Sequence, residues 1–185
     1  MKEEKRMRSF LKSKKGLSTV VTTLIILVVS VLLATVVTYY AINMTTTRVQ
    51  EENLRISKAH IWADANVNQS AFVIVNIGGR DALIYKIQVR GQDMNWSSVW
   101  FARNSSVPVE PTVIYDRAFA NYTGASLTQA NASIAPLDLK SGEYLLVYID
   151  TPGTISVEDV GVTTSITVFS ASAQYKVEVN VESAS

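Results

Sequence analysis

Residues 14–47 read KKGLSTVVTTLIILVVSVLLATVVTYYAINMTTT, and this stretch decides the fold. No charged residue occurs from Leu17 to Thr47, and residues 17–42 contain neither Gly nor Pro. About 20 apolar residues are enough to span the hydrocarbon core of a bilayer as a helix. Many of these residues are β-branched, which favours strands in water, but a buried strand rarely exceeds about ten residues. The stretch therefore predicts one long helix that is compatible with a membrane.

The charges of the chain are unevenly distributed around this helix. The 185 residues include 17 Lys and Arg, 16 Asp and Glu, one His and no Cys. Residues 1–16 carry seven basic and two acidic side chains, whereas residues 17–185 carry ten basic and fourteen acidic ones. Because basic residues beside a membrane span stay in the cytoplasm, we expect the C-terminal body to lie outside the cytoplasmic membrane. The mildly acidic body argues against a nucleic-acid-binding domain.

Three interpretations of the N-terminal region are open. A secretory signal peptide has an apolar stretch of about 7–15 residues and a small-residue cleavage site, which this longer run fits poorly. A plain signal anchor would keep its basic head and remain in the membrane. In the third interpretation, cleavage within the string Lys14-Lys15-Gly16-Leu17-Ser18 removes the charges and keeps the apolar helix.

The third arrangement resembles the class III signal peptide of archaeal type IV pilins and archaellins, in which a basic pair and a Gly precede the apolar helix. The resemblance implies that a prepilin peptidase recognises Lys14, Lys15 and Gly16 and cuts between Gly16 and Leu17. The fifth residue of the mature chain would be Val21, where bacterial pilins carry a Glu, and this agrees with the archaeal branch. The resemblance also implies a helical homopolymer, built with a pilus assembly ATPase and a membrane platform protein.

The helix is expected to continue past the apolar run to about Ser57. Glu51 and Arg55 have the favourable i, i+4 spacing with Glu first, and a helix over residues 17–57 would be roughly 60 Å long at 1.5 Å per residue. Three parts are predicted: a cleaved basic signal peptide at 1–16, a transmembrane and assembly helix with an amphipathic stalk at 17–57, and an extracellular β-sandwich at 58–185.

The apolar pattern beyond Lys58 has a period of two, which is typical of β-strands. Residues 72–77 and 82–90 flank Gly78 and Gly79, which indicates a hairpin. In the second run Leu83, Tyr85, Ile87 and Val89 are expected on one face, opposite Lys86, Gln88 and Arg90. Further strands are expected at 94–101, 143–150, 163–169 and 175–182.

The predicted fold class is α+β, with a long N-terminal hydrophobic α-helix followed by an all-β immunoglobulin-like sandwich. The Asn76-Ile77-Gly78 turn and its flanking strands are similar to the immunoglobulin-like body of archaeal pilins and archaellins. Residues 103–142 hold three of the four prolines and much Ser, Thr, Asn and Ala. We expect short edge strands and long loops there, forming an outer surface or a contact between subunits.

Asn-x-Ser/Thr sequons are more frequent than composition predicts. Ten asparagines in this composition would give about two sequons by chance, and the chain has six. N-glycosylation of an exported surface is the functional interpretation, and chance in Ser/Thr-rich loops is the alternative. The candidate acceptors are Asn43, Asn68, Asn95, Asn104, Asn121 and Asn131.

The residues give no indication of an enzyme, a cofactor or a metal site. Without Cys there are no disulfides, thiolate metal ligands or thiol nucleophiles, and no phosphate-binding Gly-rich loop occurs. The one His, His60, is expected to mark the junction between helix and sheet. Asp150, Glu158 and Asp159 lack the spacing of a calcium loop and are expected on a solvated face.

The expected function is that of a structural subunit of an archaeal type IV pilus-like filament used for adhesion. The precursor would lie in the cytoplasmic membrane, and the mature chain would be in an extracellular filament at the cell surface. The partners would be further copies of the chain, the prepilin peptidase, the assembly machinery and, before assembly, the membrane. Two alternatives stay open: an archaellin of the motility filament, and a single-pass, membrane-anchored β-sandwich binding protein that does not polymerise.

Overall fold

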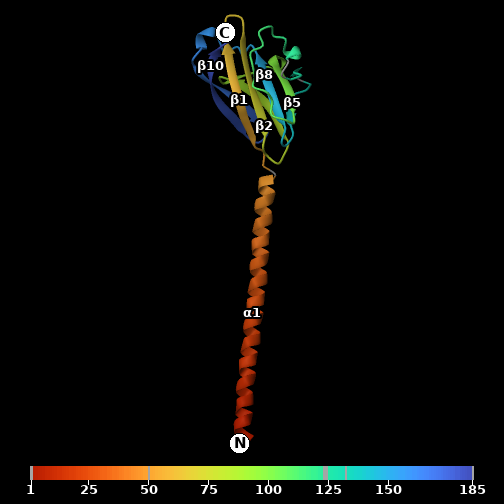
Figure 1. The fold of residues 1–185 in the computed structure, drawn as a ribbon, viewed down its shortest axis with the longest axis vertical. Helices are drawn as coiled ribbons and strands as arrows, with labels where there is room; N and C mark the ends of the chain where they lie inside the picture. The colour runs from red at the N-terminus through yellow and green to blue at the C-terminus, as the bar shows by residue number, and fades with distance from the viewer. Residues whose placement is uncertain (1, 50, 123–124, 132, 185) are drawn as a thin grey trace. The chain divides into compact units, whose positions relative to one another are not determined.

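The computed structural model describes residues 2–49, 51–122, 125–131 and 133–184, with side chains for all of these except 2–17, 48, 49 and 121. The chain divides into two compact units, residues 1–47 and 48–185. The first unit is helical and the second is β-rich (Figure 1).

A single α-helix, α1, extends over Lys2–Val49. The expected long apolar helix is therefore confirmed, and it includes the three threonines Thr45–Thr47. The helix ends earlier than the predicted stalk, because strand β1 already begins at Leu54. The side chain of Leu54 is buried in the core of the β-rich unit. Burial of that side chain outweighs the helical spacing of Glu51 and Arg55, so the prediction of helix to Ser57 was wrong.

The described residues of the β-rich unit form ten strands in one sheet, in the order β4-β3-β9-β10-β1-β2-β8-β5-β6, with β7 paired to β3. Their bounds are β1 Leu54–Ala63, β2 Asn68–Asn76, β3 Ala82–Val89, β4 Gln92–Asp93, β5 Val99–Asn104, β6 Thr128–Gln129, β7 Leu137–Leu139, β8 Tyr144–Asp150, β9 Thr163–Ser170 and β10 Gln174–Ser183.

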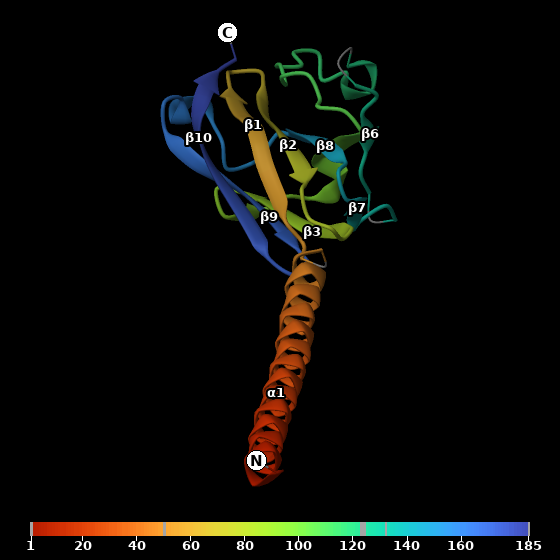
Figure 2. The same cartoon turned by 60° about the horizontal axis from the view of Figure 1, so that its bottom comes forward.

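The sheet folds into two layers at β10. Residues Gln174 to Asn180 pair antiparallel with β9, and Val181 to Ser183 pair parallel with β1. Buried side chains from β1, β2, β5 and β8 share one apolar core with those from β3, β7 and β9. Figure 2 shows the backbone of these strands, with β10 beside both β1 and β9. A helix followed by a two-layered sheet is an α+β fold, as predicted; the immunoglobulin-like character stays a prediction.

Strand β3 differs from its predicted orientation. Ala82 and Ile84 are buried in the core, whereas Leu83 and Tyr85 are exposed. The register between β3 and β9 shifts between Ile84 and Lys86, so one extra residue interrupts the alternation of faces there. Ile87 and Val89 then point inward, as expected. The shared-face prediction was right for the second half of the strand and wrong for the first.

The predicted hairpin at Gly78 and Gly79 was also wrong. Strand β2 pairs with β1 and β8, whereas β3 pairs with β4, β7 and β9, so the chain crosses from one layer to the other at these glycines. Gly78 instead packs against the chain that enters the domain. A Cβ at Gly78 would lie 2.5 Å from the carbonyl oxygen of Glu51 and 2.6 Å from the backbone nitrogen of Asn53.

The proline-rich region 103–142 has the expected short strands, β6 and β7, joined by loops. Its central part also covers the outer face of the layer that contains β1, β2 and β8. Ile114, Phe119 and Leu127 from this region form a second buried cluster with Val73 and Tyr148 of that face. The layer of β2 and β8 is thus buried on both sides.

Candidate functional site

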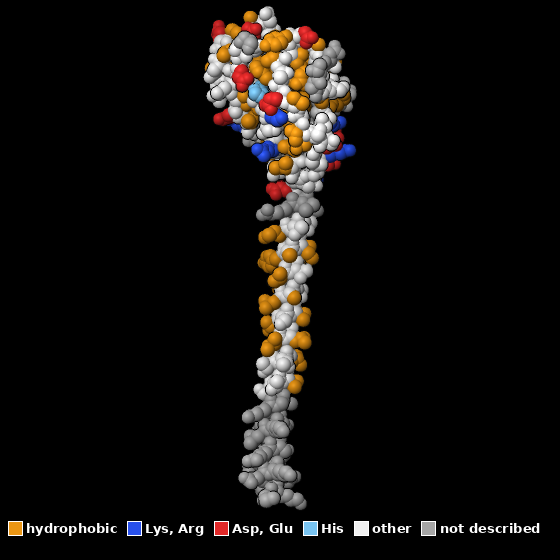
Figure 3. Space-filling model, viewed as in Figure 1, with side chains coloured by type: hydrophobic (Ala, Val, Ile, Leu, Met, Phe, Trp, Pro, Cys, Tyr) orange, Lys and Arg blue, Asp and Glu red, His pale blue; other side chains and the backbone are white. Residues whose placement is uncertain are grey.

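The first candidate site is the surface of α1 between Ser18 and Thr47. All described side chains of this segment are exposed within the chain, including every Val, Leu and Ile from Val20 to Ile42. Figure 3 shows hydrophobic side chains along the visible face of this helix. Among the described residues, this is the one helix that is long and apolar enough to cross a membrane. Thirty residues give about 45 Å of helix, more than the roughly 30 Å hydrocarbon core.

Eight Ser and Thr hydroxyl groups of this segment bond to the helix itself. Seven donate to the carbonyl oxygen four residues earlier, at 2.7–2.9 Å, and Thr23 donates to the carbonyl of Val20. The seven are Thr22, Ser30, Thr35, Thr38, Thr45, Thr46 and Thr47. These bonds let Ser and Thr lie in an apolar medium without an unsatisfied donor. Near the C-terminal end, the rings of Tyr39 and Tyr40 meet edge to face with centroids 6.2 Å apart.

The predicted cleavage site lies in the first part of α1. Lys14, Lys15, Gly16 and Leu17 have helical backbone, and their side chains lie outside those that the structure describes. Gly16 does not interrupt the helix. Cleavage between Gly16 and Leu17 therefore stays a prediction.

Three of the six sequons share one geometry. The side chains of Asn95, Asn104 and Asn131 are exposed. In each, Oδ1 accepts a hydrogen bond from the backbone N–H of the sequon Ser two residues later, at 3.1, 3.1 and 2.9 Å. This turn occupies the carbonyl oxygen of the amide with a local bond. Asn95 precedes β5, Asn104 is the last residue of β5, and Asn131 follows β6.

The other three sequons lie in different surroundings. Asn43 lies in α1, among the exposed apolar residues. Asn68 begins β2, is half-buried, and its buried Oδ1 has no hydrogen-bond partner among the described residues. Asn121 ends the short 3-10 helix Phe119–Asn121, and its side chain lies outside the described ones. The structure therefore describes an exposed candidate acceptor for a glycan at Asn95, Asn104 and Asn131.

Sequence reasoning missed two buried polar side chains that hold the region covering the sheet. The Gln69 amide donates to the carbonyl of Ile114 at 2.7 Å and accepts from its N–H at 3.1 Å. The Tyr148 hydroxyl donates to the carbonyl of Thr112 at 3.0 Å and accepts from its N–H at 3.1 Å. Burial raises the pKa of Tyr148 far above its ordinary value, so the hydroxyl keeps its proton. Residues 112–114 pair with none of the described strands, and these two side chains satisfy the backbone groups that a neighbouring strand would otherwise bond.

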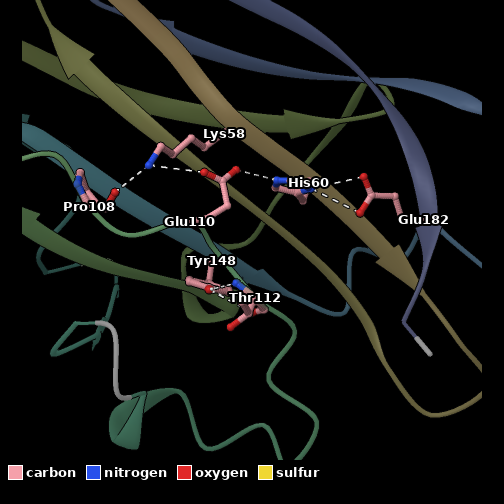
Figure 4. A network of polar contacts seen from close by, with 7 residues as sticks. All are labelled: Lys58, His60, Pro108, Glu110, Thr112, Tyr148 and Glu182. Atoms are coloured by element: carbon pink, nitrogen blue, oxygen red, sulfur yellow. Dashed lines mark hydrogen bonds and ion pairs between the residues drawn. The ribbon is translucent and has the colours of Figure 1, made fainter.

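A second candidate site surrounds His60, on the outer face of β1. Its Nε2 lies 3.0 Å from Oε1 of Glu110, and its Nδ1 lies 3.3 Å from both carboxylate oxygens of Glu182 (Figure 4). The ring stacks on Trp62, with centroids 5.3 Å apart and planes 3° apart. Lys58 Nζ lies 3.4 Å from Oε2 of Glu110. His60 is thus the seventh residue of β1. The prediction that it marks the junction of helix and sheet was wrong.

A bulge in β1 creates this arrangement. The register with β2 shifts between Ser57 and His60, and Lys58 has a positive φ of 50°. A bulge of this kind re-aims the side chains that follow it. The partners of His60 lie 50 and 122 residues away in the sequence, so no local pattern could have shown them.

Two of the three acidic residues considered as possible cation ligands, Asp150 and Asp159, are paired with arginines. Asp159 Oδ1 lies 2.7 Å from Nη1 of Arg90, and Asp150 Oδ1 lies 3.4 Å from Nε of Arg117. Within the described residues, no group of three or more Asp, Glu or His side chains could hold a metal ion.

No family model matches the chain, and no curated protein matches it. The structure defines an α+β protein in which an apolar N-terminal helix, compatible with membrane anchoring or with a signal, precedes a β-rich domain. This layout is compatible with that of a pilin.

Proposed function

We propose that the chain is the subunit of an archaeal type IV pilus-like filament, cleaved after Gly16 and assembled through its N-terminal helix. The observation that carries this proposal is the uncharged surface of α1 from Ser18 to Thr47, which follows directly on the basic pair and Gly of a class III signal. Removal of the head would leave a mature chain that begins with this helix.

The energetics of the helix favour a partner that covers it. Fourteen Val, Leu and Ile side chains between Val20 and Ile42 are at least 46% exposed within the chain. Burying such a side chain contributes about 1.5–3 kcal/mol, so leaving this surface in water would cost on the order of 20 kcal/mol. That exceeds the usual stability of a domain, about 5–15 kcal/mol. Lipid covers the surface before assembly, and the helices of other copies would cover it in a filament.

The remaining features agree with an exported subunit. The basic head would keep the N-terminus in the cytoplasm and place the β-rich domain outside. Glycans at Asn95, Asn104 and Asn131 would then lie outside the cell. The proposed use of the filament is adhesion to other surfaces or cells. The prepilin peptidase, an assembly ATPase and a platform protein would be the partners, with no cofactor and no catalytic residue in the chain itself.

N-terminal sequencing of the chain from membranes and from material sheared off the cells tests the proposal. We expect Leu17 as the first residue in both fractions, with filaments in the sheared one. An intact head in the membranes and no filament would instead identify a signal anchor. Filaments whose loss stops swimming and leaves attachment intact would identify an archaellin. A mass excess on the peptides with Asn95, Asn104 and Asn131 would check the glycans.

Gly16→Asp is the matching variant, because it places a side chain and a charge at the cut. We expect it to accumulate as the uncut precursor. Ser9→Asp adds the same charge to the head away from the cut and should be processed normally. Normal processing of Gly16→Asp would contradict the assigned site.

A further inference from the structure

The ring of His60 joins three segments that are distant in the sequence. His60 belongs to β1, Glu182 belongs to β10, and Glu110 belongs to the loop segment 105–111. Each ring nitrogen faces a carboxylate at hydrogen-bonding distance: 3.0 Å for Glu110 and 3.3 Å for Glu182. Figure 4 shows the ring between the two carboxylates, which lie on opposite sides of it.

This geometry requires a particular protonation state. A neutral imidazole has one N–H donor and one lone pair, and an ionised carboxylate has acceptors only. A neutral His60 could therefore bond to one of the two carboxylates, while its other nitrogen would present a lone pair to the second. Only the imidazolium, which carries two N–H groups, can donate to both.

We propose that His60 is a pH-sensitive latch: its doubly protonated ring ties Glu110 of the 105–111 segment and Glu182 of β10 to β1, and loss of one proton breaks the tie to Glu110 and loosens the 105–111 segment, which Lys58 still holds at this site. Histidine is the side chain that ordinarily changes charge between about pH 5 and 8. The latch is thus closed while both ring nitrogens carry a proton and open once one proton is lost. This inference concerns the β-rich domain alone and does not depend on filament formation.

The surroundings of the ring determine which contact opens. Lys58 is the other cation at the site, and its Nζ contacts Glu110 at 3.4 Å and donates to the carbonyl of Pro108 at 2.9 Å. The residue that pairs with His60 on β2 is Ala71, which has no charge. Glu182 has no cation other than His60 among the described residues, whereas Glu110 keeps Lys58. The neutral ring therefore retains its N–H for Glu182, and Glu110 is the contact that is lost.

The latch also has an acid limit, because the carboxylates must be ionised. Hydrogen bonding from His60, with a further contribution from Lys58, lowers the pKa of Glu110 below its ordinary value. Glu110 therefore stays charged further into acid than a free glutamate. The segment that is loosened carries two exposed apolar side chains, Val107 and Val109, on either side of Pro108.

Spin labelling of the full-length chain in detergent micelles tests the latch. The chain has no Cys, so Val109→Cys provides a single labelling site next to Glu110, at a position that is 66% exposed. We expect the ratio of mobile to immobile label to rise about two- to fivefold between pH 5 and pH 8, the range for one exposed ion pair. A label at Val157→Cys, on the 154–162 loop, should show no such change. Equal mobility at position 109 at both pH values would overturn the proposal.

Two further variants separate the latch from a general effect of pH. His60→Gln keeps a neutral donor that does not titrate, and Glu110→Gln keeps an acceptor without the charge. In both backgrounds we expect the pH dependence of the label at position 109 to disappear while the circular dichroism stays unchanged. If the pH dependence persists in His60→Gln, another group is responsible and the proposal is wrong. Because His60 is the one histidine of the chain, its ring ¹⁵N signals also report directly whether both nitrogens carry protons at pH 5.

Discussion

Substitution of Gly78 by Ala should strongly destabilise the β-rich domain. Gly78 lies against the chain that enters the domain, and three backbone hydrogen bonds fasten the two segments. Ile77 N–H and Gly78 N–H donate to the carbonyl of Asn53 at 2.9 and 3.1 Å, and Gly79 N–H donates to the carbonyl of Glu51 at 3.3 Å. A Cβ at Gly78 would come within 2.6 Å of backbone atoms on both Glu51 and Asn53.

The magnitude follows from these contacts. Real Cβ atoms essentially never approach another atom within 3.0 Å, so the two segments must separate, and backbone atoms cannot rotate aside as a side chain can. If the three hydrogen bonds are lost at about 0.5–1.5 kcal/mol each, the free energy of unfolding falls by about 2–4 kcal/mol. With a urea m-value of about 2 kcal/mol/M, the midpoint should fall by about 1–2 M.

Urea unfolding followed by tryptophan fluorescence measures this change. Trp62, Trp96 and Trp100 all lie in the β-rich unit, so the signal reports that unit even in the full-length chain in detergent. Gly153→Ala is the matched control, because a Cβ there meets nothing within 4 Å. It should leave the free energy of unfolding unchanged or raise it by up to about 1 kcal/mol. Equal stabilities of the two variants would refute the close-approach argument.

Three further substitutions should lower the free energy of unfolding, raise it, or change its dependence on pH, and the same unfolding assay measures all three. Tyr148→Phe should lower the free energy of unfolding by about 1–3 kcal/mol, because it strips two hydrogen bonds from the covering segment, whereas Tyr144→Phe on the same strand should have little effect. Thr164→Val should raise it by about 1 kcal/mol, since the buried hydroxyl has no partner among the described residues. The pKa of Asp159 is lowered mainly by a hydrogen bond from the backbone N–H of Ser156, so its contribution is present above the ordinary pKa of 3.8 and is lost as the pH falls through the lower folded value. Asp159→Asn should therefore lose less stability between pH 5 and pH 3 than the unchanged chain, and an equal loss would contradict this assignment.

The parts of the fold that could be predicted are those with a local cause. The apolar run dictates its own helix, because its length and lack of charge allow no other element. The alternation of Tyr175, Val177 and Val179 with charged residues places β10 correctly, and the structure leaves these three half-buried and their neighbours exposed. The bulge in β3 could not be predicted, because Ala82, Leu83, Ile84 and Tyr85 are all apolar or aromatic and suit either face.

The composition of two strands indicates that the outer face of their layer is covered. Residues 71–75 and 145–149 are continuous apolar runs, and a strand that is buried on both faces has this composition. The continuous runs indicate a second layer, but they do not identify region 103–142 as its source. The helix surface could be found from composition alone, whereas the contacts of His60 depend on the tertiary fold.

The hydrogen bonds of the α1 hydroxyls affect how easily the helix moves from lipid into a bundle of helices. Because eight of them bond to carbonyls of their own helix, these groups keep their hydrogen bonds wherever the helix moves. Transfer from lipid to a bundle of like helices then breaks none of these eight bonds, so van der Waals packing and lipid entropy carry much of the difference between the two states. Such a transfer has no large polar barrier in either direction. A helix of this kind could leave a membrane and return to it repeatedly, chemically unchanged.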